Sequence, residues 1–78
     1  MTITIYSTPT CPYCKMAKEF LKEHKIAFTD IDVASDQVAM QKMIEKTGQL
    51  GVPVIDVDGE ILVGFDKKNL AKLVGIEA

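Results

Sequence analysis

Residues 11–14, Cys-Pro-Tyr-Cys, lie where the hydrophobic pattern of the chain changes its period. Residues 2–6 before them alternate as a half-buried strand does, and apolar residues after them recur at helical spacing to about His24. Pro12 suits the first helical position, because its φ is fixed near the helical value and no N–H is needed there. The sequence therefore predicts a strand, a tight turn and a helix whose N-cap is Cys11.

This placement of two thiols predicts redox chemistry. Cys11 and Cys14 are spaced by three residues, so they share one helix face and modest rotamer changes can join them in a disulfide. The unpaired N–H groups and the positive end of the helix dipole favour a thiolate at Cys11. Cys14 lies deeper in the first turn and receives less of this field. We therefore assign Cys11 as the nucleophile and Cys14 as the resolving thiol.

Other uses of a Cys-X-X-Cys pair fit the sequence less well. A structural zinc site usually needs four nitrogen or sulfur ligands, and the chain has two cysteines and one histidine, His24, far along the predicted helix. Haem attachment requires histidine directly after the second cysteine, where this chain has Lys15. A static disulfide closes too short a loop to stabilise the fold much. We expect no metal ligands in the monomer.

Length and composition indicate one small globular domain, residues 1–78. The net charge is −2 and the lysines are dispersed, which argues against nucleic-acid binding. The apolar runs are shorter than the ~18 residues of a membrane span, and the start, Met1-Thr2-Ile3, lacks the basic residues of a secretory signal. We expect a cytoplasmic protein. Disulfides in that compartment are rarely structural, which favours a catalytic pair.

The middle of the chain continues the alternation of strand and helix. Residues 26–33 have a partly alternating pattern and are predicted to form a strand. Ser35 or Asp36 can cap a second helix that runs to about Thr47, and Gly48 is a typical C-terminal stop.

The last third contains a hairpin and a third helix. Residues 54–57 and 60–63 are apolar runs on either side of Asp58-Gly59, which is a strong signal for a two-residue hairpin turn. Asp66 can cap a final helix that extends to Val74. The element order β-α-β-α-β-β-α predicts an α/β fold with a four-stranded mixed sheet and three helices distributed over both faces.

Two loops stand next to these elements. Gly51-Val52-Pro53 precedes the third strand, and Gly64-Phe65-Asp66 precedes the last helix. The free N–H groups at the start of that helix are suited to bind a carboxylate. Both loops are also explained as ordinary turn and cap residues.

With these motifs together, the chain resembles a glutaredoxin of the thioredoxin-fold superfamily over essentially its whole length. The resemblance implies a thioredoxin-like fold, a cis Val52-Pro53 bond beside the thiols, and glutathione as co-substrate with no bound cofactor. Glutathione would form a mixed disulfide with Cys11. The residues implied in its groove are Tyr13, Val52, Pro53, Gly64, Phe65 and Asp66.

The chain departs from the family pattern at three positions. Thr8 stands where the family often has lysine, Gly51 where it commonly has threonine, and Lys67 where a second acidic residue often follows Asp66. Without a lysine at position 8, the site attracts the Cys11 thiolate and the glycyl carboxylate of glutathione less strongly. With lysine at position 67, the γ-glutamyl ammonium loses an acidic partner. We expect Thr8, Pro12 and Lys67 to modulate the site.

The resemblance implies a glutathione-dependent thiol–disulfide oxidoreductase that reduces protein disulfides and glutathione mixed disulfides through Cys11 and Cys14. One alternative is a small redoxin recharged by a flavoenzyme similar to thioredoxin reductase. Another is a dimer that holds an iron–sulfur cluster through Cys11 of each chain and two glutathiones, which a proline at position 12 disfavours in the family. Otherwise we expect a monomer. The resemblance makes ribonucleotide reductase, or a flavoprotein reductase, a candidate partner.

Overall fold

The computed structural model describes residues 2–75. Within that range it has four strands and three helices in the predicted order. Their bounds are β1 Ile3–Ser7, α1 Pro12–Glu23, β2 Thr29–Asp32, α2 Gln37–Thr47, β3 Val54–Val57, β4 Glu60–Val63 and α3 Lys67–Val74. The thioredoxin-like α/β fold that the sequence predicts is confirmed.

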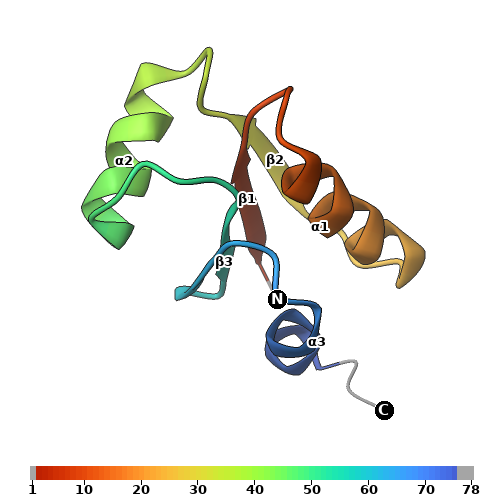
Figure 1. Cartoon of the computed structure of the whole chain (residues 1–78). Coiled ribbons are helices and arrows are strands. Elements are labelled where there is room, and N and C mark those ends of the chain that lie inside the picture. Colours follow the sequence, from red (N-terminus) through yellow and green to blue (C-terminus); the bar gives the residue numbers. More distant parts are fainter. Residues whose placement is uncertain (1, 76–78) are drawn as a thin grey trace.

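The strands form one mixed sheet in the order β2-β1-β3-β4. β1 pairs with β2 in parallel and with β3 antiparallel, and β3 and β4 form the antiparallel hairpin (Figure 1). In this register Ile5 of β1 lies opposite Ile55 of β3, and Ile3 lies opposite Val57. The central strands β1 and β3 are the most buried of the four, because helices cover both of their faces.

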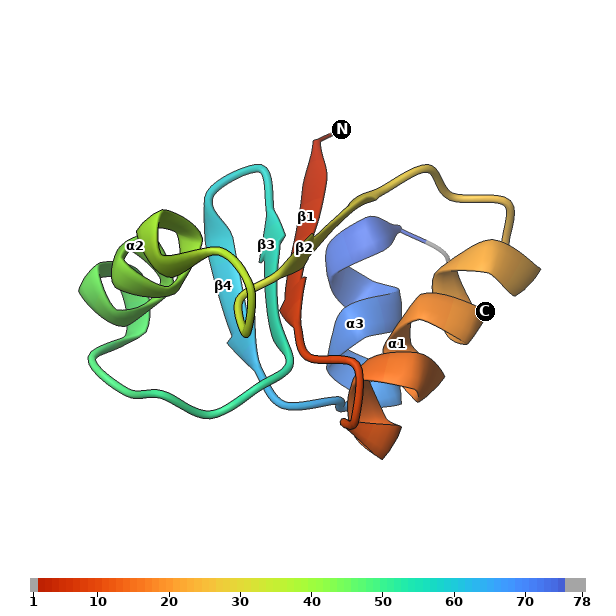
Figure 2. The same ribbon diagram turned by 90° about the horizontal axis from the view of Figure 1, so that it is seen from above.

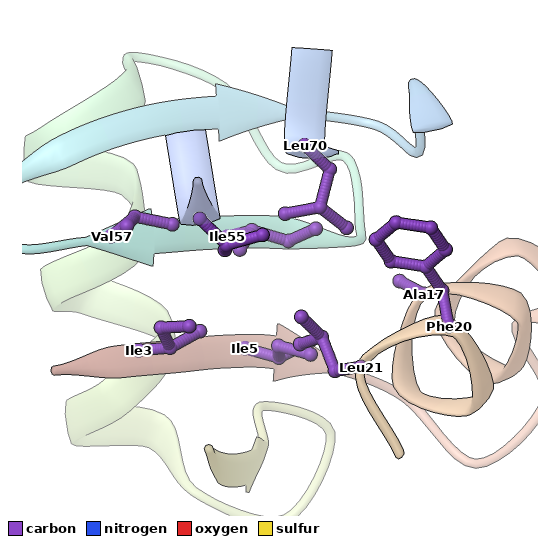
Figure 3. Packing of buried hydrophobic residues seen from close by; sticks show 9 residues of the cluster. Ile3, Ile5, Ala17, Phe20, Leu21, Ile55, Val57 and Leu70 are labelled. Carbon is purple, nitrogen blue, oxygen red and sulfur yellow. The ribbon is translucent and has the colours of Figure 1, made fainter. Parts of the chain in front are cut away.

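The helices lie on both faces of the sheet. α1 and α3 cover one face and α2 covers the other, as Figure 2 shows. The α1/α3 side contains the larger apolar cluster, in which side chains of β1 and β3 meet those of the two helices (Figure 3). Its buried members are Ile3, Ile5, Ala17, Phe20, Leu21, Ile55, Val57, Leu70 and Val74. The inward face that helical spacing predicts on α1 is confirmed at Ala17, Phe20 and Leu21. It is wrong at Met16, which was expected in the core and is exposed.

A smaller apolar cluster lies under α2. Its buried members are Tyr6, Val33, Ala39, Met43 and Val54. Met43 is fully buried and is a packing residue of this cluster. On this side the Lys46 Nζ lies 2.8 Å from an Asp56 carboxylate oxygen and 3.4 Å from the Tyr6 hydroxyl, and it also lies over the Tyr6 ring. Lys46 thus ties α2 to β1 and β3.

β2 is shorter than the predicted strand 26–33, which is a correction. α1 ends in a Schellman motif: the Ile26 N–H donates to the Leu21 carbonyl at 2.9 Å, and the Lys25 N–H donates to the Lys22 carbonyl at 3.0 Å. Lys25 has a φ of 57°, the left-handed conformation that this motif needs. Residues 25 and 26 therefore close the helix, and pairing with β1 begins only at Thr29.

The other predicted local signals are confirmed. Asp36 caps α2 by accepting the Ala39 N–H at 3.0 Å, and Gly48 ends that helix in the left-handed conformation. Asp58 and Gly59 form the hairpin turn, and both have positive φ, as the favoured two-residue turns require. No helix in the described residues, 2–75, is both long enough and apolar enough to cross a membrane.

Candidate active site

Cys11 is the N-cap of α1, as the sequence predicts. Its backbone is extended, with φ −90° and ψ 112°, and Pro12 follows in the first turn. The Cys11 Sγ accepts the Cys14 N–H at 3.1 Å. The Cys11 sulfur therefore has a backbone donor and lies at the positive end of the helix dipole.

Cys14 differs from Cys11 in exposure. The Cys14 side chain is fully buried, whereas Cys11 is partly exposed. Burial, and then the hydrogen bond with Cys11, raise the pKa of the Cys14 thiol to about 11. At neutral pH Cys14 is therefore a buried, protonated thiol, and Cys11 is the sulfur that a substrate can reach. This asymmetry matches the assigned roles of nucleophile and resolving thiol.

The loop before β3 lies beside the nucleophile. The Val52-Pro53 bond is cis, as the family resemblance implies, and Pro53 is fully buried. The Val52 carbonyl oxygen lies 3.8 Å from the Cys11 Sγ. The Gly64 N–H donates to the Pro53 carbonyl at 2.7 Å, which joins this loop to the one that opens α3. The structure therefore brings together at one site three segments that are far apart in sequence.

One of the free backbone N–H groups at the start of α3 is already bound by the capping residue, Asp66. The Asp66 carboxylate accepts the Asn69 N–H at 3.3 Å and the Asn69 side-chain amide at 2.8 Å. Phe65 is half-buried, with its ring centroid 6.1 Å from that of Phe20. The predicted cap at Asp66 is confirmed. Because this carboxylate already takes one backbone donor of the helix terminus, an external carboxylate has fewer donors there and meets a negative charge.

Lys67, the first residue of α3, lies next to this cap. Its Nζ lies 5.9 Å from the centre of the Phe20 ring, within the range of a cation–π contact. It borders a groove of about 200 Å³ whose lining residues are Met16, Glu19, Phe20, Glu23, Phe65 and Lys67. Of the residues predicted for glutathione, this groove includes Phe65, but not Cys11 or Tyr13. Tyr13 is 60% exposed on the outer surface of α1.

Two positions that depart from the family pattern have definite surroundings. The Thr8 carbonyl accepts the Cys11 N–H at 3.4 Å, so the backbone of Thr8 supports the turn before α1. The Gln49 side chain brackets Gly51, accepting its N–H and donating to its carbonyl. A Cβ at Gly51 would lie 2.6 Å from the Gln49 Oε1. Sequence reasoning missed Gln49, because nothing in the hydrophobic pattern marks it.

A polar network behind Cys14 was also missed. Ser7, only 2% exposed, donates its hydroxyl to an Asp30 oxygen at 2.6 Å, and the Lys18 Nζ donates to the other oxygen at 3.0 Å. Partial burial by itself would raise the pKa of Asp30, but the hydrogen bonds and the charge of Lys18 lower it on balance. The spacing of four between Cys14 and Lys18 could have indicated Lys18. The role of Asp30 could not be predicted from the sequence, because its contact with Ser7 depends on the pairing of β1 with β2.

The part of the chain that the structure describes, residues 2–75, contains no group of three or more His, Cys, Asp or Glu side chains placed to hold a metal ion. Cys11 is partly exposed, so its sulfur can meet a ligand from outside the chain. An iron–sulfur cluster shared between two chains stays a prediction, and anaerobic reconstitution with a visible absorbance readout tests it.

The chain is similar to known proteins over most of its length. The family model described as Glutaredoxin matches residues 3–62. An uncharacterized glutaredoxin-like 8.6 kDa protein of the rubredoxin operon in Clostridium pasteurianum is 51% identical over 92% of this chain and 96% of its own. The glutaredoxin-like protein NrdH of Lactococcus lactis subsp. cremoris is 41% identical over 91% of this chain and 97% of its own.

Solved structures show the same fold over nearly the whole chain. A mutant of the thioredoxin-like protein BC3987 superposes with a TM-score of 0.92 at 34% identity, covering 97% of both chains. The glutaredoxin-like protein NrdH-redoxin from Escherichia coli superposes with a TM-score of 0.82 at 25% identity, covering 94% of this chain and 95% of its own. That structure is described as the basis of a thioredoxin-like activity profile.

Proposed function

The chain belongs to the glutaredoxin family and is a thiol–disulfide oxidoreductase, and from this premise we propose that it is a dithiol reductant of protein disulfides, recharged by a flavoenzyme similar to thioredoxin reductase. The observation that carries the proposal is the asymmetric pair. Cys11 is accessible at a helix N-terminus, and Cys14 is a buried, protonated thiol whose N–H touches the Cys11 sulfur. Such a pair can resolve its own mixed disulfide without a second thiol from solution.

The reaction proceeds by two exchanges. The Cys11 thiolate attacks one sulfur of the target disulfide, and the first target thiolate leaves. Cys14 then attacks the Cys11 sulfur, which releases the second target thiol and forms the Cys11–Cys14 disulfide. The target gains two electrons and the dithiol loses two. A reductase must next return two electrons to the pair.

Two observations at the start of α3 support a flavoenzyme over glutathione as the source of these electrons. The Asp66 carboxylate accepts the Asn69 N–H, which leaves fewer backbone donors for a γ-glutamyl carboxylate, and the Lys67 ammonium lies over the Phe20 ring. A lysine there also repels the γ-glutamyl ammonium. The relatives named NrdH, one of them described by a thioredoxin-like activity profile, support the same choice.

Glutathione is the second candidate, and a specific observation favours it. The Val52 carbonyl beside the Cys11 sulfur and the cis Val52-Pro53 bond are the features that the family resemblance associates with the cysteinyl part of glutathione. Glutathione mixed disulfides are then a second substrate class. Ribonucleotide reductase stays a candidate among protein targets.

The test compares two recharging systems on one disulfide substrate. Turnover is followed by NADPH consumption with thioredoxin reductase, and separately with glutathione plus glutathione reductase. We expect faster turnover with thioredoxin reductase at equal concentrations of the protein. Faster turnover with glutathione would reverse the order of the two candidates, and no turnover with either would remove both.

A further inference from the structure

Behind the buried thiol lies a chain of polar side chains that the redox assignment does not use. The Ser7 hydroxyl at the end of β1 donates to Asp30 of β2, and Asp30 accepts the Lys18 ammonium of α1. The hydroxyl of Ser7 is buried, so it fixes Asp30 from the inside of the protein. The Lys18 side chain is only 23% exposed. These contacts hold the ammonium against the protein instead of leaving it to sample the solvent.

Lys18 lies one helical turn after Cys14 and on the same face of α1. With a rise of 1.5 Å per residue, the backbone of Lys18 is about 6 Å from that of Cys14 along the helix axis, and about 10 Å from that of Cys11. Because Lys18 lies nearer to Cys14 than to Cys11 along α1, its positive charge stabilises an anion at Cys14 more than one at Cys11. In agreement with this geometry, Lys18 lowers the pKa of the Cys14 thiol, although burial outweighs it.

We propose that Lys18, held by Asp30 and Ser7, is a positioning residue that stabilises the Cys14 thiolate while Cys14 resolves the mixed disulfide. The proposal rests on the dithiol function argued above. In this step the Cys14 thiolate bonds to the Cys11 sulfur, and the bond from Cys11 to the target breaks. The target sulfur leaves with that electron pair, and the proton that Cys14 gave up ends on the departing thiolate.

The charge of Lys18 matters most in the mixed disulfide. In the free dithiol, burial and Cys11 both oppose ionisation of Cys14. Once Cys11 is bonded to the target it carries no charge, and the burial of Cys14 remains. The charged groups nearby are then Lys18 on α1, Asp30 on β2 and Lys22 farther along α1. Asp30 both anchors Lys18 and partly offsets its charge, so Lys18 itself is the informative residue to change.

The two exchanges can be timed separately with the aromatic disulfide dithiobis(nitrobenzoate). One equivalent reacts with Cys11 and releases a first coloured thionitrobenzoate, and attack by Cys14 then releases a second. Stopped-flow absorbance near pH 7 is recorded for Lys18→Met, Lys18→Arg and Ser7→Ala. Lys22→Met is the matched control, because it removes the same charge from the same helix one turn farther from Cys14.

We expect Lys18→Met to slow the second release about three- to tenfold, shift its pH profile to higher pH, and leave the first within about twofold. Lys18→Arg should restore most of the rate, because it keeps the charge and can pair with Asp30. Ser7→Ala should slow the second release by less, since Lys18 then loses only its indirect anchor. Lys22→Met should behave as the unchanged protein.

Several results would overturn the proposal. One is equal slowing of both releases by Lys18→Met, and another is equal slowing of the second release by Lys18→Met and Lys22→Met. A third is an unchanged pH profile in Lys18→Met when urea unfolding shows the variant to be folded. Failure of the proposed function itself has a different signature: the unchanged protein would release one thionitrobenzoate, or the second release would persist in Cys14→Ser.

Discussion

Two ion pairs join a helix to a strand, one on each face of the sheet. Lys18 of α1 pairs with Asp30 of β2 at 3.0 Å, and Lys46 of α2 pairs with Asp56 of β3 at 2.8 Å. In each pair one side chain is 41% exposed, so solvent screens both pairs and each contributes little to stability by itself. As contacts they are nearly equivalent.

Their neighbours differ. Lys18 lies one turn from the buried thiol of Cys14, whereas Lys46 lies over the Tyr6 ring, which belongs to the apolar cluster under α2. The charge of Lys18 can therefore influence the ionisation of the Cys14 sulfur. The charge of Lys46 has no thiol beside it and contributes only to the packing of α2 on the sheet. The role of a surface ion pair is therefore decided by the groups close to it, and the α1/α3 side carries the chemistry.

The largest effect should come from the sulfurs themselves. Cys11→Ser should abolish turnover on all disulfide substrates, because the nucleophile at the helix N-terminus is gone. Cys14→Ser should lose reduction of protein disulfides by the dithiol route and keep reduction of glutathione mixed disulfides, which needs one thiol. Steady-state assays on both substrate types measure this. Equal loss in both variants on both substrates would contradict the assigned roles.

On the opposite face, Met43→Ala should affect stability without affecting chemistry. Met43 is fully buried under α2, so its truncation leaves a cavity and should lower the free energy of unfolding by about 2–5 kcal/mol. Urea unfolding measures the loss. The rate of the first thionitrobenzoate release from the folded variant should stay within about twofold of the unchanged protein. A large change in that rate would break the separation between the two faces.

Alkaline pH should act through the buried thiol. The pKa of Cys14 is raised from its ordinary value of 9.0 to about 11, so in the unfolded chain the thiol ionises first. Its contribution to stability is present below about pH 9 and is lost as pH rises through 11, by up to about 3 kcal/mol. Urea unfolding at pH 8 and 10 detects the loss. A Cys14→Ala variant with the same slope against pH would assign the loss to other groups.

The two lysines provide the sharpest test of the comparison. Lys46→Met should lower the free energy of unfolding by about 0.5–1 kcal/mol, because Asp56 loses its partner and Tyr6 loses a cation–π contact. It should leave the second thionitrobenzoate release unchanged, whereas Lys18→Met should slow it. Urea unfolding and stopped-flow absorbance on the same samples give both readouts. A slowed second release in Lys46→Met would mean that any helix-to-strand pair matters equally.

The smallest effect should appear at the start of α3. Lys67→Asp places a carboxylate where it can pair with the γ-glutamyl ammonium, worth about 0.2–1 kcal/mol for an exposed contact. The apparent KM for glutathione should fall by up to several-fold, and by less at high salt. Lys67→Gln is the control, because it removes the contact with Phe20 without adding the acid. An unchanged KM in Lys67→Asp would mean that glutathione does not place its γ-glutamyl end there.

Local sequence signals predicted a large part of this molecule. The N-caps Cys11, Asp36 and Asp66 and the hairpin turn at Asp58-Gly59 all lie where the sequence placed them. Each depends on hydrogen bonds or dihedral angles within about four residues, which a single sequence displays directly. The limits of β2 were wrong because Ile26 belongs to the Schellman motif that closes α1. Lys25, in the left-handed position of that motif, is not the glycine that usually marks it.

By itself, then, the sequence determined the order of elements, the position of the two thiols at a helix terminus and the family of the chain. Only the tertiary structure decided which groups surround those thiols. Val52 is 41 positions from Cys11, and Asp30 is 23 positions from Ser7, so their meeting depends on how β1 pairs with β2 and β3. Strand pairing is set by burial of both sheet faces at once, which no local pattern encodes.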